Sequence, residues 1–407
     1  MRQNKFSLAV AATVAVAALA GCGGGSSAGN QAPKIQFTSQ VVFGDSLSDV
    51  GSYAVGSIIL GANPSGTAYS GGRYTVNAAV GSGPAHTNWT ELMAGTLNLP
   101  LPCPAETGLE GDPAYGFYAA IKTYTPQCTS YAQGGAMVTD PYGPGNANTT
   151  GNPVDGSAVL GQLTVPIVTQ IQNHLAAHGG AFSGTEVVFL LAGGNDAIFN
   201  SELYVGSVAQ AYTVGGAAAA QAEAATAGPA AVQAMVTAGT QLAGYINNLI
   251  LANGAKYVVL VNLPDLSTTP YGAILESNLA GTQALVKTMV TTFNSTVAAN
   301  VSSSNVLIVD AFTTSDLQIS NPAQFSLTNV TTPACNLNAI TASNPTGNPL
   351  ASPTTPESGT SLVCNATNVI AGDISHYEFA DQVHPTPYGN ILLARYVASQ
   401  MAIKGWL

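Results

Sequence analysis

Residues 41–53, VVFGDSLSDVGSY, decide how the fold begins, because the apolar run 41–43 leads directly into a polar segment. That segment holds three serines, two aspartates and two glycines in a chain with only 7% charged residues. The apolar run predicts a short buried strand. Gly44 permits a tight turn that exposes Ser46. Asp45 and Ser46 therefore mark either the capped start of a helix or the start of an active site.

Strand-like and helix-like segments alternate along the rest of the chain. Apolar runs predict further strands at residues 186–191, 256–264 and 305–312. Helical spacing predicts helices at residues 230–252 and 277–299, and a last helix from about residue 386 to the end. This alternation predicts an α/β fold, a mostly parallel sheet with helices on both faces. Because ligands bind at the carboxyl ends of such strands, Asp45 and Ser46 are expected at the edge that holds the site.

The composition bounds the class of protein. The 407 residues suffice for one large domain or two smaller ones, with ample material for a core. Nine basic residues against 20 acidic ones give a formal net charge of −11. A nucleic-acid surface needs clustered Lys and Arg to displace counterions, so no nucleic-acid partner is expected.

The N-terminus carries the pattern of an export signal. Arg2 and Lys5 precede a short apolar stretch, residues 6–20, which ends at Gly21 and Cys22. The small residues leading into the cysteine resemble a bacterial lipobox, whose cysteine becomes the lipidated first residue; the alternative is an ordinary secretory signal. We therefore expect a lipoprotein signal at residues 1–22, a flexible tether at 23–39 and one domain at 40–407. The absence of Asp after Cys22 favours the outer membrane or cell surface, and release from the cell is the alternative.

Four further cysteines fit an oxidising compartment. They are Cys103, Cys128, Cys335 and Cys364. Four cysteines allow three pairings, and local closure favours Cys103 with Cys128 and Cys335 with Cys364. None of them lies in a Cys-x-x-Cys pattern and no histidine lies at ligand spacing from one, so we expect no metal site.

Histidines supply the candidate general bases. The chain has five, His86, His174, His178, His376 and His384. Two of them follow an aspartate by three residues, Asp373 before His376 and Asp381 before His384. Either aspartate could hold its imidazole in the tautomer that accepts a proton from a serine. The other three have no such partner in the sequence.

Four blocks in order carry a resemblance to a known family. They are GDSL at residues 44–47, the glycines Gly134 and Gly135, GGND at 193–196 and DQVH at 381–384. Together they resemble the GDSL, or SGNH, family of esterases and lipases, from about residue 40 to the end of the chain. The resemblance implies a flavodoxin-like three-layer α/β/α sandwich, the SGNH hydrolase fold. Where the family usually has an asparagine near the glycine block, this chain has Ser130. We expect this difference to affect how the loop is supported rather than the chemistry.

The resemblance also implies roles for the residues of these blocks. Ser46 is expected to be the nucleophile, His384 its general base and Asp381 the partner of that histidine. The oxyanion donors are expected to be the Ser46 N–H, a glycine N–H from Gly134 or Gly135, and the Asn195 side chain. The mechanism requires no cofactor. A second serine pattern, G-x-S-x-G at residues 25–29, lacks the strand and helix that a nucleophile elbow needs and is interpreted as accidental.

The predicted activity is hydrolysis of carboxylic esters through an acyl-serine intermediate, with a small-molecule or lipid ester as the substrate. Acyl transfer to an alcohol would use the same residues, and a non-catalytic surface-binding lipoprotein is the alternative from another class. Four insertion-like loops are expected to shape the pocket, at residues 67–88, 105–127, 140–157 and 332–378. The acyl chain and the alcohol of the substrate stay open at this point.

The lipobox leads to a prediction about anchoring. Cys22→Ser should move the protein from the detergent phase to the aqueous phase of a detergent extraction, because the acyl chains on Cys22 would be absent. Partition is measured by immunoblotting of both phases. Wild-type protein that already partitions into the aqueous phase would contradict the anchor.

Overall fold

The computed structural model describes residues 35–55, 58, 72–78, 88–111, 113, 117–149, 160–336 and 361–407. The predicted signal, Cys22, residues 23–34 of the tether and His86 lie outside these residues. Residues 35–39 of the predicted tether are described, and Phe37 among them is buried in the core of the domain. The chain forms a central parallel sheet in the order β1-β4-β5-β6. Its strands are β1 (Gln40–Gly44), β4 (Val187–Leu191), β5 (Val258–Val261) and β6 (Val306–Val309). The predicted parallel α/β architecture is confirmed.

Strand composition explains why this sheet is the centre of the molecule. The strands read QVVFG, VVFLL, VVLV and VLIV, and every residue of the first three is buried. Continuous β-branched and apolar runs are typical of parallel strands that are covered on both faces. The register aligns Val42 with Phe189 and Phe189 with Val259, so all strands point the same way.

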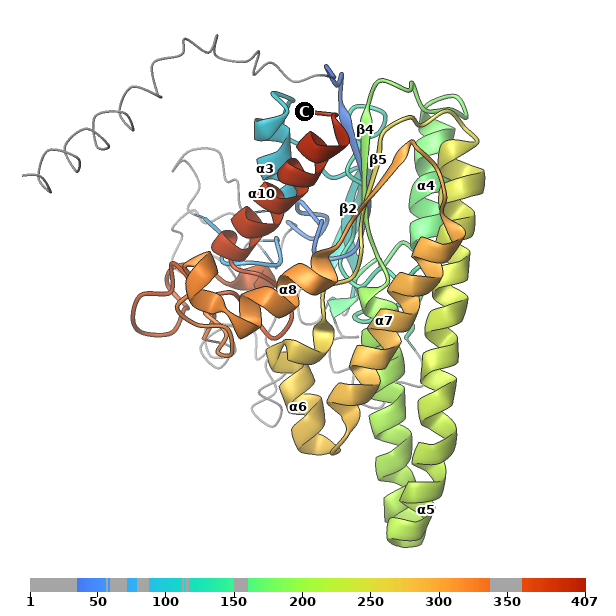
Figure 1. Ribbon diagram of the computed structural model, residues 1–407, viewed down its shortest axis with the longest axis vertical. Coiled ribbons are helices and arrows are strands. Elements are labelled where there is room, and N and C mark those ends of the chain that lie inside the picture. Colours follow the sequence, from blue (N-terminus) through green and yellow to red (C-terminus); the bar gives the residue numbers. More distant parts are fainter. Residues whose placement is uncertain are drawn as a thin grey trace, which may run out of the picture.

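Helices cover both faces of the sheet (Figure 1). On one side lie α3 (Trp89–Thr96) and α10 (Pro387–Lys404), which pack on each other. On the other side lie α4 (Ile167–Ala177), α7 (Thr282–Asn300) and the end of α5 (Gly194–Tyr245), which continues as a short π-helix, Ile246–Leu251. This arrangement confirms the three-layer sandwich. The predicted last helix is also confirmed, since Thr386 caps α10.

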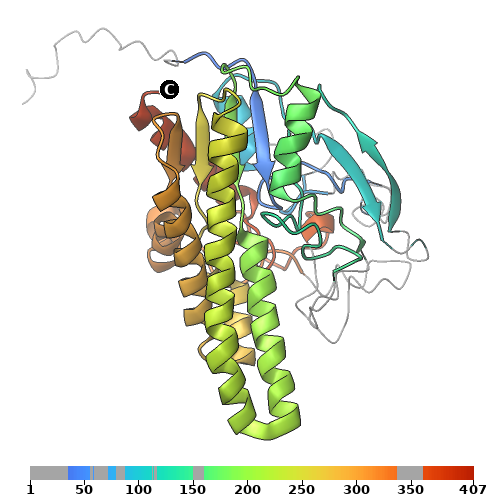
Figure 2. The ribbon, with the colours of Figure 1, turned by 90° about the vertical axis from the view of Figure 1, so that its right-hand side faces the viewer.

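The α5 segment is a hairpin of two helical arms rather than one straight helix. The arms meet at Gly216, whose φ of 70° and ψ of −165° are not helical. Figures 1 and 2 show the hairpin projecting well beyond the sheet, on the side where the strands end. The sequence prediction covered the larger, later part of the second arm, residues 230–252, and missed the rest of the hairpin, because the Ala- and Gly-rich tip has no apolar periodicity.

Three other sequence predictions need correction. The helix predicted at 277–299 corresponds to α7, which begins later, at Thr282, because Gly281 before it adopts a φ of 89°. The first two predicted residues belong to the end of a separate helix, α6 (Pro270–Asn278). The loop predicted at 105–127 contains an antiparallel pair of strands, β2 (Glu106–Glu110) and β3 (Tyr118–Thr123). A short helix, α8 (Ala311–Ser320), follows β6 directly and shortens the strand predicted at 305–312.

The two disulfides lie outside the central sheet. Cys103 is bonded to Cys128, and Cys335 to Cys364. The locally closed pairing is therefore confirmed. Cys335 and Cys364 are buried in a second, smaller apolar cluster that also contains Tyr53, Tyr74 and Leu109.

Gly193, at the start of α5, yields a prediction about stability. It has a φ of 104°, and a Cβ there would lie 2.3 Å from Cζ of Phe293. Gly193→Ala should lower the free energy of unfolding by about 3 kcal/mol, from left-handed backbone strain plus overpacking. Gly281→Ala is the matched control, because Gly281 has a similar φ and open space around it. Equal losses for the two variants in urea unfolding would contradict the proposed clash.

Candidate active site

The Ser46 turn forms where β1 meets the end of β4. A Cβ on Gly44 would lie 2.6 Å from the carbonyl oxygen of Leu191, so a larger residue does not fit. The Gln170 side chain accepts a hydrogen bond from Gly44 N–H and donates one to the Gly44 carbonyl oxygen, both at 2.9 Å. This bracing presents Ser46 in the wall of a cavity at the carboxyl ends of the strands.

Asp45 ties this turn to the beginning of α5. Its carboxylate accepts a hydrogen bond from Leu47 N–H at 3.0 Å and another from the backbone N–H of Gly194. Burial raises the pKa of Asp45 to about 6, although these donors and the nearby His384 oppose the rise. Asp45 thus caps a helix, as the sequence allowed, but the helix is α5 and not the segment that follows Asp45.

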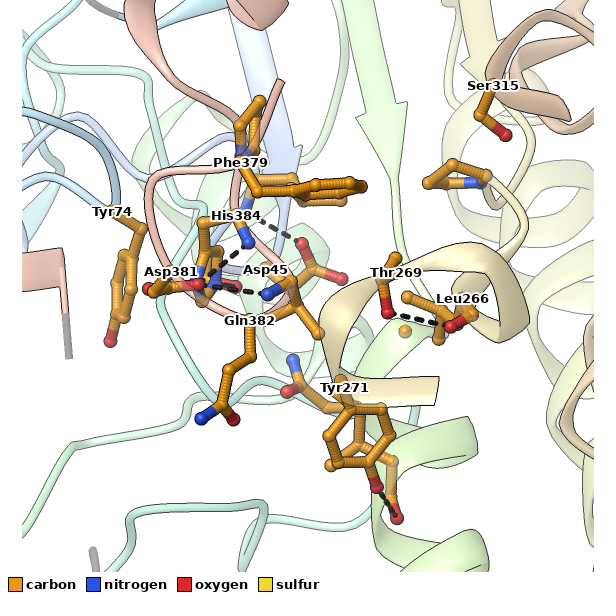
Figure 3. A pocket seen from close by; sticks show the side chains of 18 of the residues that line it. Asp45, Tyr74, Leu266, Thr269, Tyr271, Ser315, Phe379, Asp381, Gln382 and His384 are labelled. Atoms are coloured by element: carbon orange, nitrogen blue, oxygen red, sulfur yellow. Dashed lines mark hydrogen bonds and ion pairs between the residues drawn. The ribbon is translucent and has the colours of Figure 1, made fainter. Parts of the chain in front are cut away.

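Ser46, His384 and Asp381 form a connected chain of polar groups. His384 Nε2 lies 2.7 Å from Ser46 Oγ, although 338 residues separate them in the sequence. His384 Nδ1 lies 2.8 Å from each carboxylate oxygen of Asp381. Figure 3 shows Asp45, His384 and Asp381 close together, with Tyr74 on one side of them and Leu266 and Thr269 on the other. The predicted serine, base and aspartate are thus brought into contact.

Asp381 is buried and held by several donors. Its oxygens accept hydrogen bonds from the N–H groups of Val383 and His384, at 3.0 and 2.8 Å. Ser361 donates twice, from its N–H at 3.1 Å and from its hydroxyl at 2.5 Å. Burial alone would raise the pKa of Asp381, but His384 and these donors outweigh it and lower the pKa to about 2. Asp381 is therefore ionised at neutral pH.

Two backbone N–H groups of residues that line the cavity, those of Ser46 and Gly135, are candidates for binding an oxyanion. The Ser46 N–H has no acceptor among the described residues, and neither does the Gly135 N–H. Gly134 N–H, in contrast, donates to the buried carboxylate of Asp49 at 3.0 Å. Of the two candidate glycines the geometry therefore favours Gly135, which also lines the cavity.

Asn195 lies in the first turn of α5 and lines the same cavity. Its side-chain nitrogen donates to the carbonyl oxygen of Ala136 at 2.9 Å, and this bond fixes the plane of the amide. A primary amide has two N–H groups, so the second remains for a ligand. Sequence reasoning expected Asn195 at the site from its motif, and the residue does line the cavity that holds Ser46.

The alternative histidines lie elsewhere. His376 Nδ1 lies 2.6 Å from the carbonyl oxygen of Ser326, and its ring stacks on Tyr388 with ring centroids 4.2 Å apart. Its sequence partner Asp373 accepts a hydrogen bond from Ser375 N–H instead. His174 is buried, and burial together with the neighbouring His178 lowers its pKa to about 3. None of these histidines lines the cavity.

The cavity has a volume of about 620 Å³ and reaches from Ser46 to helices that the sequence did not connect with the site. Its wall includes one face each of α5, α6 and α8, together with the loop that follows β5. Of the four loops expected to shape it, three contribute described residues, namely Tyr74, Pro144 and Glu378. The loop at 105–127 contributes none of its described residues, because its strands pack in the second apolar cluster.

Within the described ranges, no group of three or more His, Cys, Asp or Glu side chains is arranged to hold a metal ion.

A serine, a histidine and a buried aspartate in contact at the carboxyl edge of a parallel sheet form the arrangement that serine hydrolases use. The chain matches the family model described as GDSL-like Lipase/Acylhydrolase over residues 41–397. It therefore belongs to this family, and the resemblance inferred from the sequence blocks is confirmed. No curated protein matches the chain.

The buried carboxyls predict how stability depends on pH. Asp196 is 6% exposed, and burial raises its pKa from 3.8 to about 7. Since the folded protein binds this proton more tightly than the unfolded chain, stability from Asp196 is greatest near pH 4 and falls as pH rises toward about 7. Asp196→Asn keeps an oxygen that can accept from Val138 N–H.

We expect the melting temperature of the wild type to fall more steeply than that of Asp196→Asn between pH 5 and pH 8. Thermal unfolding followed by circular dichroism across this range measures both slopes. Equal slopes of melting temperature against pH in the two proteins would show that the proton on Asp196 does not cause the pH dependence.

Proposed function

We propose that the protein is a serine esterase that hydrolyses carboxylic esters through an acyl-serine intermediate. The observation that carries this proposal is the unbroken contact from Ser46 Oγ to His384 Nε2 and from His384 Nδ1 to Asp381, at 2.7 and 2.8 Å. A serine hydroxyl becomes a good nucleophile only when a neighbouring base takes its proton. The geometry supplies that base, and membership of an acylhydrolase family supports the reaction class.

In the first half of the reaction, Ser46 Oγ attacks the ester carbonyl carbon while its proton moves to His384 Nε2. The carbonyl π electrons move onto oxygen and form a tetrahedral oxyanion. When the oxyanion collapses, the bond to the alkoxy oxygen breaks and His384 gives that oxygen its proton. An acyl-Ser46 ester and a free alcohol result, with His384 neutral again.

In the second half, water takes the place of the alcohol. His384 removes one proton from the water as its oxygen attacks the acyl carbon, and the bond to Ser46 Oγ then breaks. The proton returns to Ser46, and the carboxylic acid leaves. Asp381 accepts a hydrogen bond from His384 Nδ1 throughout, which keeps Nε2 facing Ser46 and stabilises the imidazolium.

The oxyanion would be stabilised by three fixed donors, the N–H groups of Ser46 and Gly135 and the second N–H of Asn195. Because the bond to Ala136 already orients the Asn195 amide, little reorganisation is needed when charge develops.

The export signal and anchor belong to the same proposal. We place the enzyme at a membrane surface through lipidated Cys22, with the catalytic domain starting near residue 40 and the tether between. Support comes from the lipobox-like sequence and from the two disulfides, which fit an oxidising compartment. Within the described part of the chain, no helix is long and apolar enough to cross a membrane.

The direct test is hydrolysis of p-nitrophenyl esters by purified protein. Ser46→Ala and His384→Ala should each lower kcat by about 10⁴-fold or more, since serine and histidine of such a unit act together. His376→Ala is the control and should keep the wild-type rate, because its ring is engaged with Ser326 and Tyr388. Hydrolysis that survives Ser46→Ala would overturn the proposal.

The role of Asn195 gives a second prediction. Asn195→Ala should lower kcat by roughly 10² to 10³-fold with little change in KM, because the donor acts on charge that exists only in the transition state. Asn200→Ala is the matched control: it lies one turn later on α5, and its amide donates to the carbonyl oxygen of Asp196. An Asn195→Ala enzyme that keeps its turnover, or loses it only by unfolding, would make Asn195 a structural residue.

A further inference from the structure

The cavity is built from helix faces that continue outward from the catalytic groups. On α5 the residues facing it recur at helical spacing, namely Asn195, Ile198, Glu202 and Val205. The same spacing recurs on α6 with Tyr271, Ile274, Leu275 and Asn278, and on α8 with Ala311, Thr314, Ser315, Gln318 and Ile319. The wall that begins at the oxyanion donor Asn195 therefore continues outward with aliphatic side chains from all three helices, among them Ile198, Ile274 and Ile319, interspersed with polar ones.

The position of this surface relative to His384 indicates which half of an ester, the acyl chain or the alcohol, would lie against it. His384 has to protonate the leaving alcohol, so the alcohol lies on the His384 side, where Tyr74 packs on the imidazole with ring centroids 4.7 Å apart. The carbonyl oxygen faces Asn195, and the acyl chain leaves the carbonyl carbon toward the remaining wall. Ile198 and Val205 lie on the same face of α5 as Asn195, with Leu266 and Leu275 from the neighbouring elements.

Resting on the esterase function above, we propose that this cavity is an acyl-chain site and that the substrate carries a linear aliphatic acyl group of about eight carbons or more. A methylene fills roughly 30 Å³, about one water's share of liquid volume, so an acetyl group would occupy only about a tenth of the 620 Å³. Cavities of this size usually bury most of their ligand's surface. Leu266 and Leu275, at 4% and 5% exposed, offer the chain a preformed aliphatic wall.

Chain length should therefore raise kcat/KM. Each methylene removed from water is worth up to about fourfold in binding. Octanoyl has six methylenes more than acetyl, and we expect at least about a 30-fold preference for p-nitrophenyl octanoate over p-nitrophenyl acetate, both used below their micelle-forming concentrations.

A pair of variants tests whether the acyl chain of the substrate lies in the cavity. Val205→Trp should fill the space beside α5 and lower the octanoate-to-acetate ratio of kcat/KM about tenfold or more. Val214→Trp places the same side chain on the same helical arm at a position that is 84% exposed, and it should leave the ratio unchanged. Ile274→Trp, from the α6 wall, provides a second blocking variant should Val205→Trp lower the melting temperature.

The outcomes separate this inference from the esterase function. An enzyme that hydrolyses acetate through Ser46 but shows no gain with octanoate would overturn the acyl-chain site and leave the esterase function standing. A length preference that both blocking variants leave intact would also overturn it. Failure to hydrolyse any ester in the series would overturn both.

A second, independent observation concerns the segment that holds Asp381. The short helix Ser361–Val363 lies next to Cys364, whose disulfide partner is Cys335. Ser361 donates twice to Asp381, as described above, and the Cys335 N–H donates to the carbonyl oxygen of Ala380 at 2.9 Å. One end of the disulfide therefore bonds to Ala380, the neighbour of Asp381, and the other end lies three residues after Ser361, which bonds to Asp381 itself.

The same segment is held from a second direction. The side-chain nitrogen of Asn77 donates to the carbonyl oxygens of Ser361 and Cys364, at 3.1 and 3.0 Å. Ser361 and Asn77 are 0% and 2% exposed. A buried hydroxyl on a segment whose backbone is held from two sides can fix the direction of the carboxylate to which it donates.

We infer that Ser361 is a positioning residue for Asp381 and that the Cys335–Cys364 disulfide holds it there. Ser361→Ala removes a hydrogen bond to an ionised group while the backbone N–H remains. We expect kcat to fall about tenfold at unchanged KM. The rate at which a phosphonate ester labels Ser46 should fall by a similar factor, and Ser361→Thr should restore most of the activity.

The chain offers a matched control in its other disulfide. Replacing Cys335 and Cys364 together by serine should lower kcat at 25 °C, whereas replacing Cys103 and Cys128 should not, since the described residues around that bond do not touch Asp381. Wild-type kcat in Ser361→Ala would overturn the inference. The inference would also be overturned if both disulfide variants lost the same fraction of kcat and this loss matched the fall in their melting temperatures.

Discussion

The hydrogen bond between Ser46 Oγ and His384 Nε2 joins residues 338 positions apart, so the fold has to bring both of them to one place. Each partner is placed by a different part of the fold. Ser46 follows β1 at the carboxyl edge of the parallel sheet, and His384 precedes α10, which packs on α3 and against β6. The sandwich fold thus brings the nucleophile oxygen of Ser46 and the base nitrogen of His384 to within 2.7 Å of each other.

A chain with so few ionisable side chains places several of its carboxyl groups where water is excluded. Asp45, Asp49, Asp196 and Asp381 are each at most 6% exposed. Burial of a charge is costly unless donors surround it, and each of these carboxylates accepts backbone N–H groups from turns that border the site. The same bonds fix those turns: Asp45 joins the Ser46 turn to α5, and Asp49 holds Gly134. The active site is in this sense organised around its buried acids.

Much of this arrangement could be predicted from the sequence. Apolar runs such as VVFLL predicted the strands, and the motif residues Ser46, Asn195, Asp381 and His384 meet at one edge. Ser361 could not be found, because a single serine three residues before a cysteine has no periodicity, and it reaches Asp381 only through a disulfide-closed loop. Nor could the hairpin tip of α5 or the split of α6 from α7 be predicted, since small residues carry no hydrophobic pattern. Gly134 and Gly135 became distinguishable only once Asp49 was seen to accept from one of them.

The most direct measurement is the site and rate of covalent labelling by an organophosphonate ester, followed by intact-protein and peptide mass spectrometry. If His384 activates Ser46, the wild type should gain one phosphonyl group, on the peptide that contains Ser46, and His384→Ala should gain it orders of magnitude more slowly at the same melting temperature. Labelling at another residue, or labelling of Ser46 at an equal rate without His384, would contradict a catalytic site built on this contact.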